Sequence, residues 1–365
     1  MEKKVLALIL VIAMMLGLAA CGKQAPASSG SAADGSGAAG ASTTGLRGSS
    51  DENYYMCVFV SGVEYWFPVY AGMKDACKQL GVNCYYEGTT EYDAQKQVDS
   101  FESILAKNPK GILLSPITAE AFNEPINRAI DQGVTVVTYA SDSPDSKRPA
   151  YVTSDNIKEG TAAARAVAED MGGKGSVMVL RNPGQTNHDI RCDAFIKTIE
   201  KEYPGIKVVA DIATKQDSQA GYDAVMSTYQ KYPDLGGVFS PESVSITGAA
   251  TAAKELGGTI RCMCCDTSDT LLDMLKAGDL FGIITPDQYM QGYLGMLSLY
   301  IAAHPENVNP INERKALGQN IMDITIDNGL TIVTAETADF YYVADYAKNI
   351  GYTSIEDMLS PYTVD

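Results

Sequence analysis

Short apolar runs alternate with longer segments whose apolar residues recur at helical spacing, from residue 53 to residue 303. Each short run fits a strand covered on both faces, and each longer segment fits an amphipathic helix, so the alternation predicts parallel sheets. The predicted strands cover residues 55–60, 83–86, 111–115, 135–138, 151–153, 175–180, 206–210, 236–240, 259–265 and 281–285. The predicted helices cover residues 67–80, 92–107, 120–132, 157–171, 191–202, 217–232, 245–256, 271–277 and 289–303.

The pattern restarts near residues 153–156, which divides it into two β/α runs of similar size. This order favours two doubly wound α/β lobes, and a closed barrel of roughly 250 residues is the competing topology. After His304 only short apolar runs follow, at 321–326, 330–333 and 340–343, and these suit segments that tie one lobe to the other. We expect an N-terminal lobe of 53–154 plus about 287–320, and a C-terminal lobe of 155–286 plus about 321–365.

The N-terminus predicts a lipoprotein signal peptide over residues 1–20. Two lysines precede an apolar run that ends in Leu18-Ala19-Ala20-Cys21-Gly22, and this ending resembles a bacterial lipobox. We therefore expect lipidation of Cys21 and a chain held by acyl groups at the extracytoplasmic face of the cell membrane. An uncleaved anchor is the weaker alternative, because the run is shorter than the ~20 residues of a span. Residues 21–52, rich in Ala, Gly, Ser and Thr, predict a flexible tether.

The acidic balance narrows the class of ligand. The formal net charge is −17, with only 28 Lys and Arg residues. Such a chain does not suit nucleic acid, whose phosphates need cationic partners. A neutral or cationic ligand is easier to place in this field than an anion.

Seven cysteines remain when Cys21 is assigned to the lipid. The Cys262-Met263-Cys264-Cys265 cluster lacks C-x-x-C spacing and lies in a predicted buried strand, so small buried side chains are favoured over a metal site. Cys57 and Cys84 fall on neighbouring predicted strands, where a disulfide is conceivable but not favoured. We expect no metal and no cofactor.

The candidate binding residues follow the carboxyl ends of the predicted strands, where ligands bind in open parallel sheets. Aromatic rings there can stack on the C–H face of a sugar, while carboxylates, amides and an arginine take its hydroxyls. For each carboxylate, a helix-capping or turn role is an equally good interpretation. The candidates are Tyr65, Trp66, Ser141, Asp142, Asn187, His188, Asp189, Arg191, Gln216, Pro241, Glu242, Asp266 and Asp287.

Motifs of catalysis are weak in this sequence. It contains neither G-x-S-x-G nor H-E-x-x-H, and Gly172-Gly173-Lys174-Gly175 precedes a predicted strand, so it reads as a helix stop rather than a phosphate loop. We therefore expect a protein that is not an enzyme. An anchored hydrolase using His188 with Asp189 or Glu242 is the alternative from a different class, and turnover of a bound sugar would reveal it.

Several segments, in this order and spacing, resemble the periplasmic sugar-binding proteins of the ribose/galactose type, which feed ABC importers. The resemblance runs from about residue 54 to residue 303, and a turn at Gly88-Thr-Thr-Glu91 together with the long C-terminal segment looks closer to the rhamnose and autoinducer-2 binding branch. Repressors that share the fold carry a DNA-binding motif where this chain has its leader and tether. The segments are 71–81, 111–116, 151–156 and 232–239.

The resemblance implies a type I periplasmic binding protein, with two lobes, a hinge and a central cleft. It places the family's paired aromatics on Tyr65 and Trp66, and its aspartate of the second lobe on Asp266. Other positions depart from the family. Ala140 stands where Asp is common, Glu242 where Asn is common and Pro286 where Gln is common, and an aromatic is common near Gln216. Asp189 stands at the position of the arginine that binds the ligand in the family, and Arg191 is nearby in the sequence. In the autoinducer-2 branch an Asp-Gln pair falls on Asn187 and His188, and a Pro on Pro241, whereas Gly62 replaces a cationic group.

These observations predict a lipid-anchored solute-binding protein that closes two lobes around a sugar or sugar-like molecule. Its expected partners are that small molecule and an ABC permease in the membrane, and the protein is expected to act as a monomer. The alternative within binding is a sensor subunit that presents a sugar or an autoinducer-2-like ligand to a membrane receptor.

Overall fold

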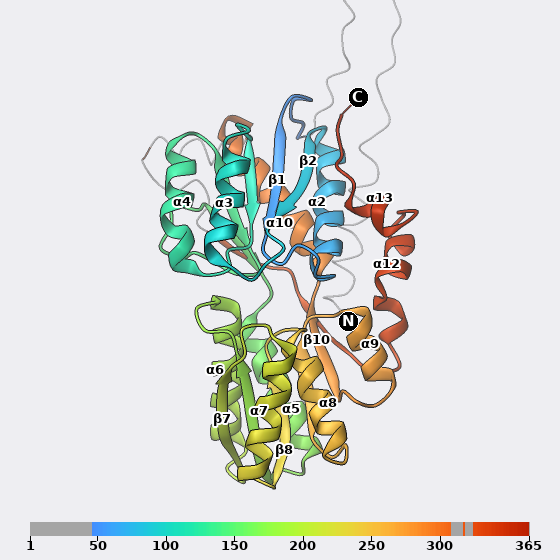
Figure 1. The fold of residues 1–365 in the computed structure, drawn as a ribbon. Helices are drawn as coiled ribbons and strands as arrows, with labels where there is room; N and C mark the ends of the chain where they lie inside the picture. The colour runs from blue at the N-terminus through green and yellow to red at the C-terminus, as the bar shows by residue number, and fades with distance from the viewer. Residues whose placement is uncertain (1–45, 308–316, 318–323, 365) are drawn as a thin grey trace, which may run out of the picture. The chain divides into compact units, whose positions relative to one another are not determined.

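Two open sheets organise the part of the chain that the computed structural model describes, which is residues 46–307, 317 and 324–364 (Figure 1). Each described sheet has six strands, and both have edge strands, so the barrel alternative is wrong. The predicted signal peptide, Cys21, most of the tether and residues 308–316 and 318–323 lie outside the described residues.

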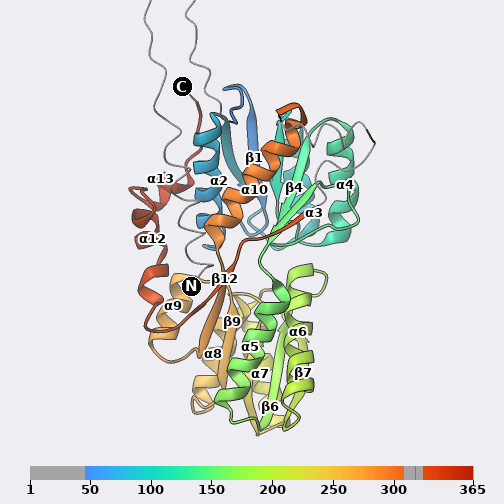
Figure 2. The same ribbon diagram turned by 180° about the vertical axis from the view of Figure 1, so that it is seen from behind.

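The first sheet has the strand order β11-β5-β4-β3-β1-β2, with every neighbouring pair parallel. Helices α2 and α10 cover one face, and α3 and α4 cover the other (Figures 1 and 2). Its strands are β1 (Asn53–Val58), β2 (Asn83–Gly88), β3 (Gly111–Leu114), β4 (Thr135–Tyr139), β5 (Ala150–Thr153) and β11 (Ile324–Asp327). Its helices are α2 (Trp66–Leu80), α3 (Ala94–Leu105), α4 (Ala119–Asp131) and α10 (Gln288–Ala303).

The second sheet repeats this winding in the order β12-β10-β9-β8-β6-β7. Only its edge strand β12 runs antiparallel to its neighbour. Helices α5 and α6 pack together on one face, and α7 and α8 on the other. The strands are β6 (Gly175–Arg181), β7 (Ile206–Ala213), β8 (Leu235–Ser240), β9 (Arg261–Cys265), β10 (Gly282–Pro286) and β12 (Leu330–Val333). The helices are α5 (Asn156–Asp170), α6 (Thr186–Glu202), α7 (Ser218–Lys231), α8 (Ser245–Glu255) and α9 (Asp269–Lys276).

Three segments of the chain cross between the lobes, after β5, after β10 and after β11 (Figure 2). Asn328 holds the three together. Its backbone N–H donates to the carbonyl of Thr153 at 3.1 Å, and its side-chain amide donates to the carbonyl of Asp287 at 2.9 Å. Since Thr153 ends β5 and Asp287 precedes α10, one residue joins all three crossings.

The sequence predicts that residues 321–365 belong to the second lobe, but the structure divides those it describes between the two lobes. β11 pairs with β5 in the first sheet, and only β12 joins the second. Residues 340–343, expected as a strand or connection, fall in a 3-10 turn (Ala338–Tyr341) and at the start of α12 (Val343–Asn349), which α13 (Ile355–Leu359) follows. Val343 packs in a cluster with Ala71 of α2, whereas Tyr341 and Tyr342 pack against the core of the second lobe.

We call residues 334–364 the C-terminal strap, because they contact both lobes (Figure 1). On the second lobe, the Tyr342 hydroxyl donates to Asp273 of α9 at 2.6 Å. On the first lobe, Val343, Tyr352 and Met358 are buried in a cluster with Ala71 of α2. The strap therefore spans the lobes on one side, in addition to the three crossings.

The end of the predicted tether belongs to the first lobe. The backbone N–H of Gly48 donates to the carbonyl of Leu80 at 2.8 Å, and that of Asn83 to the carbonyl of Glu52 at 3.0 Å. The Glu52 carboxylate also accepts a hydrogen bond from the buried Tyr54 hydroxyl. Residues 46–52 are thus held by hydrogen bonds, which the Gly- and Ser-rich composition did not indicate.

The seven described cysteines are free and buried. Cys57 and Cys84 do not face each other, because Cys57 aligns with Glu87 and Cys84 with Tyr54. Cys262 and Cys264 pack in one core cluster and Cys265 in another, as alternation along β9 requires. In the described part of the chain no helix is long and apolar enough to span a bilayer.

Candidate functional site

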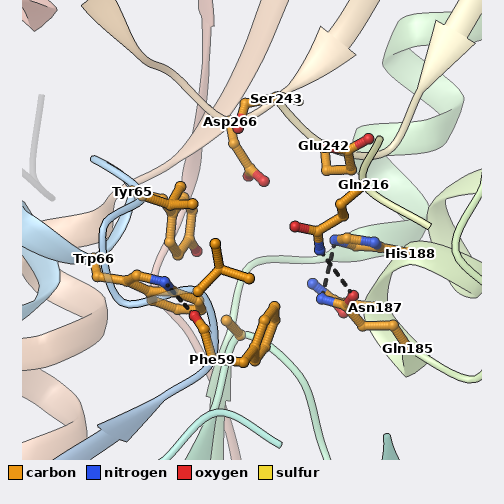
Figure 3. Close-up of a pocket in the computed structure, with 13 residues that line it drawn as sticks. Phe59, Tyr65, Trp66, Gln185, Asn187, His188, Gln216, Glu242, Ser243 and Asp266 are labelled. Atoms are coloured by element: carbon orange, nitrogen blue, oxygen red, sulfur yellow. Dashed lines mark hydrogen bonds between the residues drawn. The ribbon is translucent and has the colours of Figure 1, made fainter. Parts of the chain in front are cut away.

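A cavity lies between the carboxyl ends of the two sheets (Figure 3). About 400 Å³ of space not filled by atoms lies between its lining residues, a volume that includes space open to solvent. Both sheets reverse their winding here, β1 lying between β2 and β3, and β6 between β7 and β8. The cavity therefore occupies the position where open α/β sheets bind ligands. Its lining residues are Phe59, Val60, Val63, Tyr65, Trp66, Ala140, Gln185, Asn187, His188, Gln216, Glu242, Ser243 and Asp266.

The wall from the first lobe is aromatic and aliphatic. The Trp66 ring lies edge-on to Tyr65 and Phe59, with centroid distances of 4.9 and 5.4 Å. Its indole N–H donates to the carbonyl of Phe59 at 3.0 Å. The Tyr65 hydroxyl donates to Gln291 of α10 at 2.8 Å. Because the polar atoms of both rings are already bonded within the protein, this wall presents chiefly ring faces and C–H groups to the cavity.

The wall from the second lobe is polar and connected by side-chain amides (Figure 3). The His188 ring lies 3.0 Å from the Asn182 amide nitrogen and 3.2 Å from that of Gln185. The Gln216 amide donates to Gln185 at 3.2 Å. Burial, together with the nearby charge of Arg191, holds the pKa of His188 well below its ordinary value. His188 is therefore a neutral group at pH 7.

Asp266 faces the cavity with an unsatisfied oxygen. Its Oδ1 is buried without a hydrogen-bond partner, and it lies 3.6 Å from the Arg191 guanidinium. Burial raises the pKa of Asp266 to about 7, an effect that Arg191 opposes and that Glu159 adds to. Asn187 Oδ1 is likewise buried and unpartnered. The site thus offers two buried acceptors that a ligand with hydroxyl donors would satisfy.

Arg191 lies behind Asp266 and not in the cavity lining. It forms a buried ion pair with Glu159, and its Nε donates to Asn156 at 3.0 Å. Its Nη1 donates to the carbonyl of Pro241 at 2.9 Å. The contact of Pro241 with this network is through its backbone. Arg191 therefore connects the first turn of α5, which follows a crossing, to the loops that carry Glu242 and Asp266.

Glu242 both lines the cavity and caps a helix. Its carboxylate accepts hydrogen bonds from the backbone N–H groups of Val244 and Ser245 at the start of α8. Burial raises the pKa of Glu242, and these hydrogen bonds oppose the rise. The cap uses both carboxylate oxygens, but each oxygen can accept a second hydrogen bond, so the capping and ligand interpretations are compatible.

The structure brings seven of the thirteen candidates into the lining: Tyr65, Trp66, Asn187, His188, Gln216, Glu242 and Asp266. The other six, Ser141, Asp142, Asp189, Arg191, Pro241 and Asp287, are not among the lining residues. The carboxylates of the three aspartates among them bond to neighbouring groups of the protein. Asp142 pairs with Arg148 at 2.6 Å, Asp189 pairs with Arg181 at 3.1 Å, and Asp287 caps α10 through the N–H of Met290 at 2.9 Å.

Six lining residues were not among the candidates: Phe59, Val60, Val63, Ala140, Gln185 and Ser243. Helix α6 begins at Thr186 rather than near Arg191. Its first turn thereby carries Asn187 and His188 to the cavity, with Gln185 as its N-cap residue. The position just after a strand is the signal that could have found Ala140, whereas Phe59 falls inside the strand predicted over residues 55–60, because β1 ends at Val58.

In the described residues, no group of three or more His, Cys, Asp or Glu side chains is arranged to hold a metal ion. The polar wall is made of amides, a neutral imidazole and two buried carboxyl groups. These groups suit hydrogen bonding to a polyhydroxylated molecule, with aromatic faces opposite.

Comparisons with known proteins agree with this geometry. A model of the periplasmic binding protein domain matches residues 54–307. The xylose/arabinose-binding protein XylF of Sulfolobus acidocaldarius is 25% identical over 309 residues, covering 79% of this chain and 73% of that protein. The solved sugar-binding protein of a sugar ABC transporter from Bacillus halodurans is 31% identical with a TM-score of 0.73, covering 80% of this chain and 100% of that one. AraP, an arabinose-binding protein from Geobacillus stearothermophilus, is 32% identical with a TM-score of 0.71, covering 80% and 99%.

Proposed function

This chain belongs to the periplasmic sugar-binding proteins of ABC transporters, of the ribose/galactose type, and from that premise we propose that it captures a monosaccharide, a pentose first of all, and delivers it to an ABC permease. The pentose assignment is supported by two similar proteins, one described as binding xylose and arabinose and one as binding arabinose.

The observation that carries the proposal is the pair of unpartnered acceptors opposite an aromatic wall. Asp266 Oδ1 and Asn187 Oδ1 are buried without donors, and Tyr65 and Trp66 line the facing side. A buried acceptor without a donor is destabilising, so a ligand that supplies hydroxyl donors gains that free energy on binding. The C–H face of the same sugar ring covers the aromatic rings.

Roles follow from position in the proposed complex. Tyr65 and Trp66 stack on the sugar ring, while Asn187, His188, Gln216 and Asp266 receive or donate hydrogen bonds. Arg191 is a positioning residue, since its guanidinium contacts Asp266 and the carbonyl of Pro241 rather than the cavity.

Capture and delivery would use the three crossings. A ligand bound to both walls draws the lobes together by hinge closure, and the closed outer surface docks on the permease. We expect the binding protein to act as a monomer.

The anchor is part of the proposal and rests on Leu18-Ala19-Ala20-Cys21. We expect the mature chain to begin with an acylated Cys21 and to fractionate with membranes. Labelling with a palmitate analogue, followed by mass spectrometry of the N-terminal peptide, tests this. Cys21→Ser should abolish the label. A labelled Cys21→Ser chain, or an unlabelled wild-type chain in membranes, would contradict acylation at this residue.

Ligand binding is tested by thermal shift and calorimetry of the full chain in detergent with L-arabinose, D-arabinose, D-xylose and D-ribose. At about a hundredfold excess over Kd, the bound sugar should add about 2.7 kcal/mol to the free energy of unfolding. Gln216→Ala and Asn187→Ala should weaken binding at least tenfold, whereas Gln219→Ala, an exposed amide on α7, should not. A folded chain with no shift for any monosaccharide would refute the proposal.

A further inference from the structure

The two walls of the cavity differ in polarity, and this difference bears on which sugar can bind. Among the described lining residues, every polar side chain except that of Tyr65 comes from the second lobe. The Tyr65 hydroxyl is committed to Gln291 at 2.8 Å. The first lobe contributes Phe59, Val60, Val63, Trp66 and Ala140 besides. The Tyr65 oxygen can still accept a hydrogen bond, but no side chain of this wall has a free donor for a sugar hydroxyl.

Two of these apolar residues occupy unusual backbone positions. Val60 has φ of 45° and Ala140 has φ of 58°, both in the left-handed region. Gly, Asn and Asp adopt this region readily, and a β-branched residue there is a true outlier. Local backbone preference therefore favours a polar residue or glycine at both positions. This chain has apolar side chains at both positions in spite of that preference. Backbone strain of this kind concentrates at functional sites.

The backbone N–H and carbonyl of Ala140 are both hydrogen-bonded within the protein, and the unpartnered hydroxyls of Tyr139 and Ser141 beside it are not among the lining residues. The N–H of Ala140 donates to the carbonyl of Val152 at 2.9 Å. The carbonyl of Ala140 accepts from the Tyr151 hydroxyl at 2.7 Å. On the other side, the carbonyl of Phe59 accepts from the Trp66 indole N–H. The named backbone groups near the wall are thus satisfied within the protein.

We propose that the first-lobe wall selects a sugar with an apolar edge, a pentopyranose or a 6-deoxyhexose, against the hexose that carries a hydroxymethyl group at the same ring carbon. This inference rests on the proposed function and specifies its ligand. The sugar hydroxyls face the second lobe, where Asp266 and Asn187 hold unpartnered acceptors. The edge without hydroxyls faces Val60 and Ala140. Burying an extra hydroxyl without a partner against such a wall weakens binding about tenfold or more.

The test is calorimetry of the full chain with matched series that differ only at C5. The series are L-arabinose, D-fucose and D-galactose; D-arabinose, L-fucose and L-galactose; and D-xylose, 6-deoxy-D-glucose and D-glucose. In the series that binds best, we expect the hexose to bind at least tenfold more weakly than its pentose or 6-deoxy partner. Equal or tighter binding of the hexose would overturn this inference alone. Absence of binding for every one of these sugars and for D-ribose would overturn the proposed function with it.

Two variants test the wall itself. Ala140→Asp and Val60→Asn suit the left-handed backbone and place a polar group in the cavity. Each should reduce the preference against the hexose at least threefold. Ala106→Asp adds the same charge at an exposed position of the first lobe and should leave the ratio unchanged. An unaltered ratio in both wall variants, with folded proteins, would show that this wall does not select the sugar.

Discussion

At the scale of single residues, the cavity depends on a buried charge network behind Asp266. Arg191 and Glu159 are 2% and 0% exposed, and they form an ion pair. A buried pair is a weak source of stability as a whole, but removing one partner leaves an uncompensated charge in the interior. The network also sets the charge felt by Asp266, which Arg191 approaches at 3.6 Å.

Arg191→Met should lower the free energy of unfolding by about 3–5 kcal/mol, because it leaves the Glu159 carboxylate buried and unpaired. Adding Glu159→Leu should recover much of that loss, since both charges are then absent. Denaturant titration of the single and double variants measures the difference. If the double variant is less stable than Arg191→Met, the unpaired charge is not the cause.

The pH dependence of stability should show two opposing groups in the cavity. Burial raises the pKa of folded Asp266 to about 7, so below pH 7 the folded state takes up a proton and becomes relatively more stable. The pKa of folded His188 is held well below 6.5, so below about pH 6.5 the unfolded state takes up a proton and the fold loses stability. Each slope amounts to at most about 1.4 kcal/mol per pH unit.

Removing one of these two groups should therefore reveal the effect of the other on the pH dependence of stability. Asp266→Asn should make the melting temperature fall more steeply between about pH 7 and pH 5 than in the wild type, and His188→Gln should make it fall less. Melting curves across this range measure both. Asp223→Asn, an exposed residue of α7, should keep the wild-type profile. Identical profiles for Asp266→Asn and the wild type would contradict the assigned pKa.

At the scale of elements, α2 and α10 pack with their backbones in contact. A Cβ built on Gly292 would lie 1.7 Å from the carbonyl oxygen of Val69, and one on Gly72 would lie 2.0 Å from that of Tyr289. No L side chain fits at either distance. This reciprocal pair brings α10 close enough to bury Met296 and Leu299 in the first-lobe core.

Gly292→Ala should lower the free energy of unfolding by about 1–3 kcal/mol, because the helices must separate to admit the methyl group. Gly295→Ala is the matched change in the same helix. Its Cβ would meet the side-chain methyls of Leu113 at 2.9 Å, which can move, and helix propensity offsets part of the strain. Denaturant titration should rank Gly292→Ala below Gly295→Ala, and the reverse order would contradict the backbone contact.

The elements themselves were largely predictable, and the loops were not. β1, α2 and α10 match their predicted ranges to within a few residues, since apolar periodicity reports burial directly. Asn187 and His188 were candidates, although they were assigned to a loop and lie in the first turn of α6. Whether Asp142 or Asp189 binds a ligand or a neighbouring arginine depends on side-chain contacts that no local pattern encodes. The strap was missed for the same reason.

At the scale of the whole molecule, the C-terminal strap should limit how far the lobes move apart. It is attached to α9 through Tyr342 and Asp273 and to α2 through the buried Met358 cluster. A chain ending at Val333 should have a lower melting temperature and a broader distribution of interlobe distances without ligand. Single-molecule fluorescence with dyes on Glu124→Cys and Gln219→Cys, both exposed, measures that distribution.

The seven buried thiols make this labelling selective in a Cys21→Ser background. Phe340→Ala alters an exposed strap residue, 59% accessible, and should leave the distribution as in the intact chain. If the shortened chain shows the same distances and melting temperature as the intact chain, the strap does not restrain the lobes.

The discontinuous first lobe has a consequence for the order of folding. Strands β1–β5 are synthesised first, but α10, which buries Met296, Leu299 and Tyr300 in their core, arrives some 130 residues after β5 and completes the face that α2 leaves open. The second lobe receives β6–β10 and helices α5–α9 in one uninterrupted stretch, and its edge strand β12 comes later. Contacts close in sequence form sooner, because less chain entropy is lost in closing the loop. The core of the lobe that is made first is therefore expected to form after the core of the second lobe.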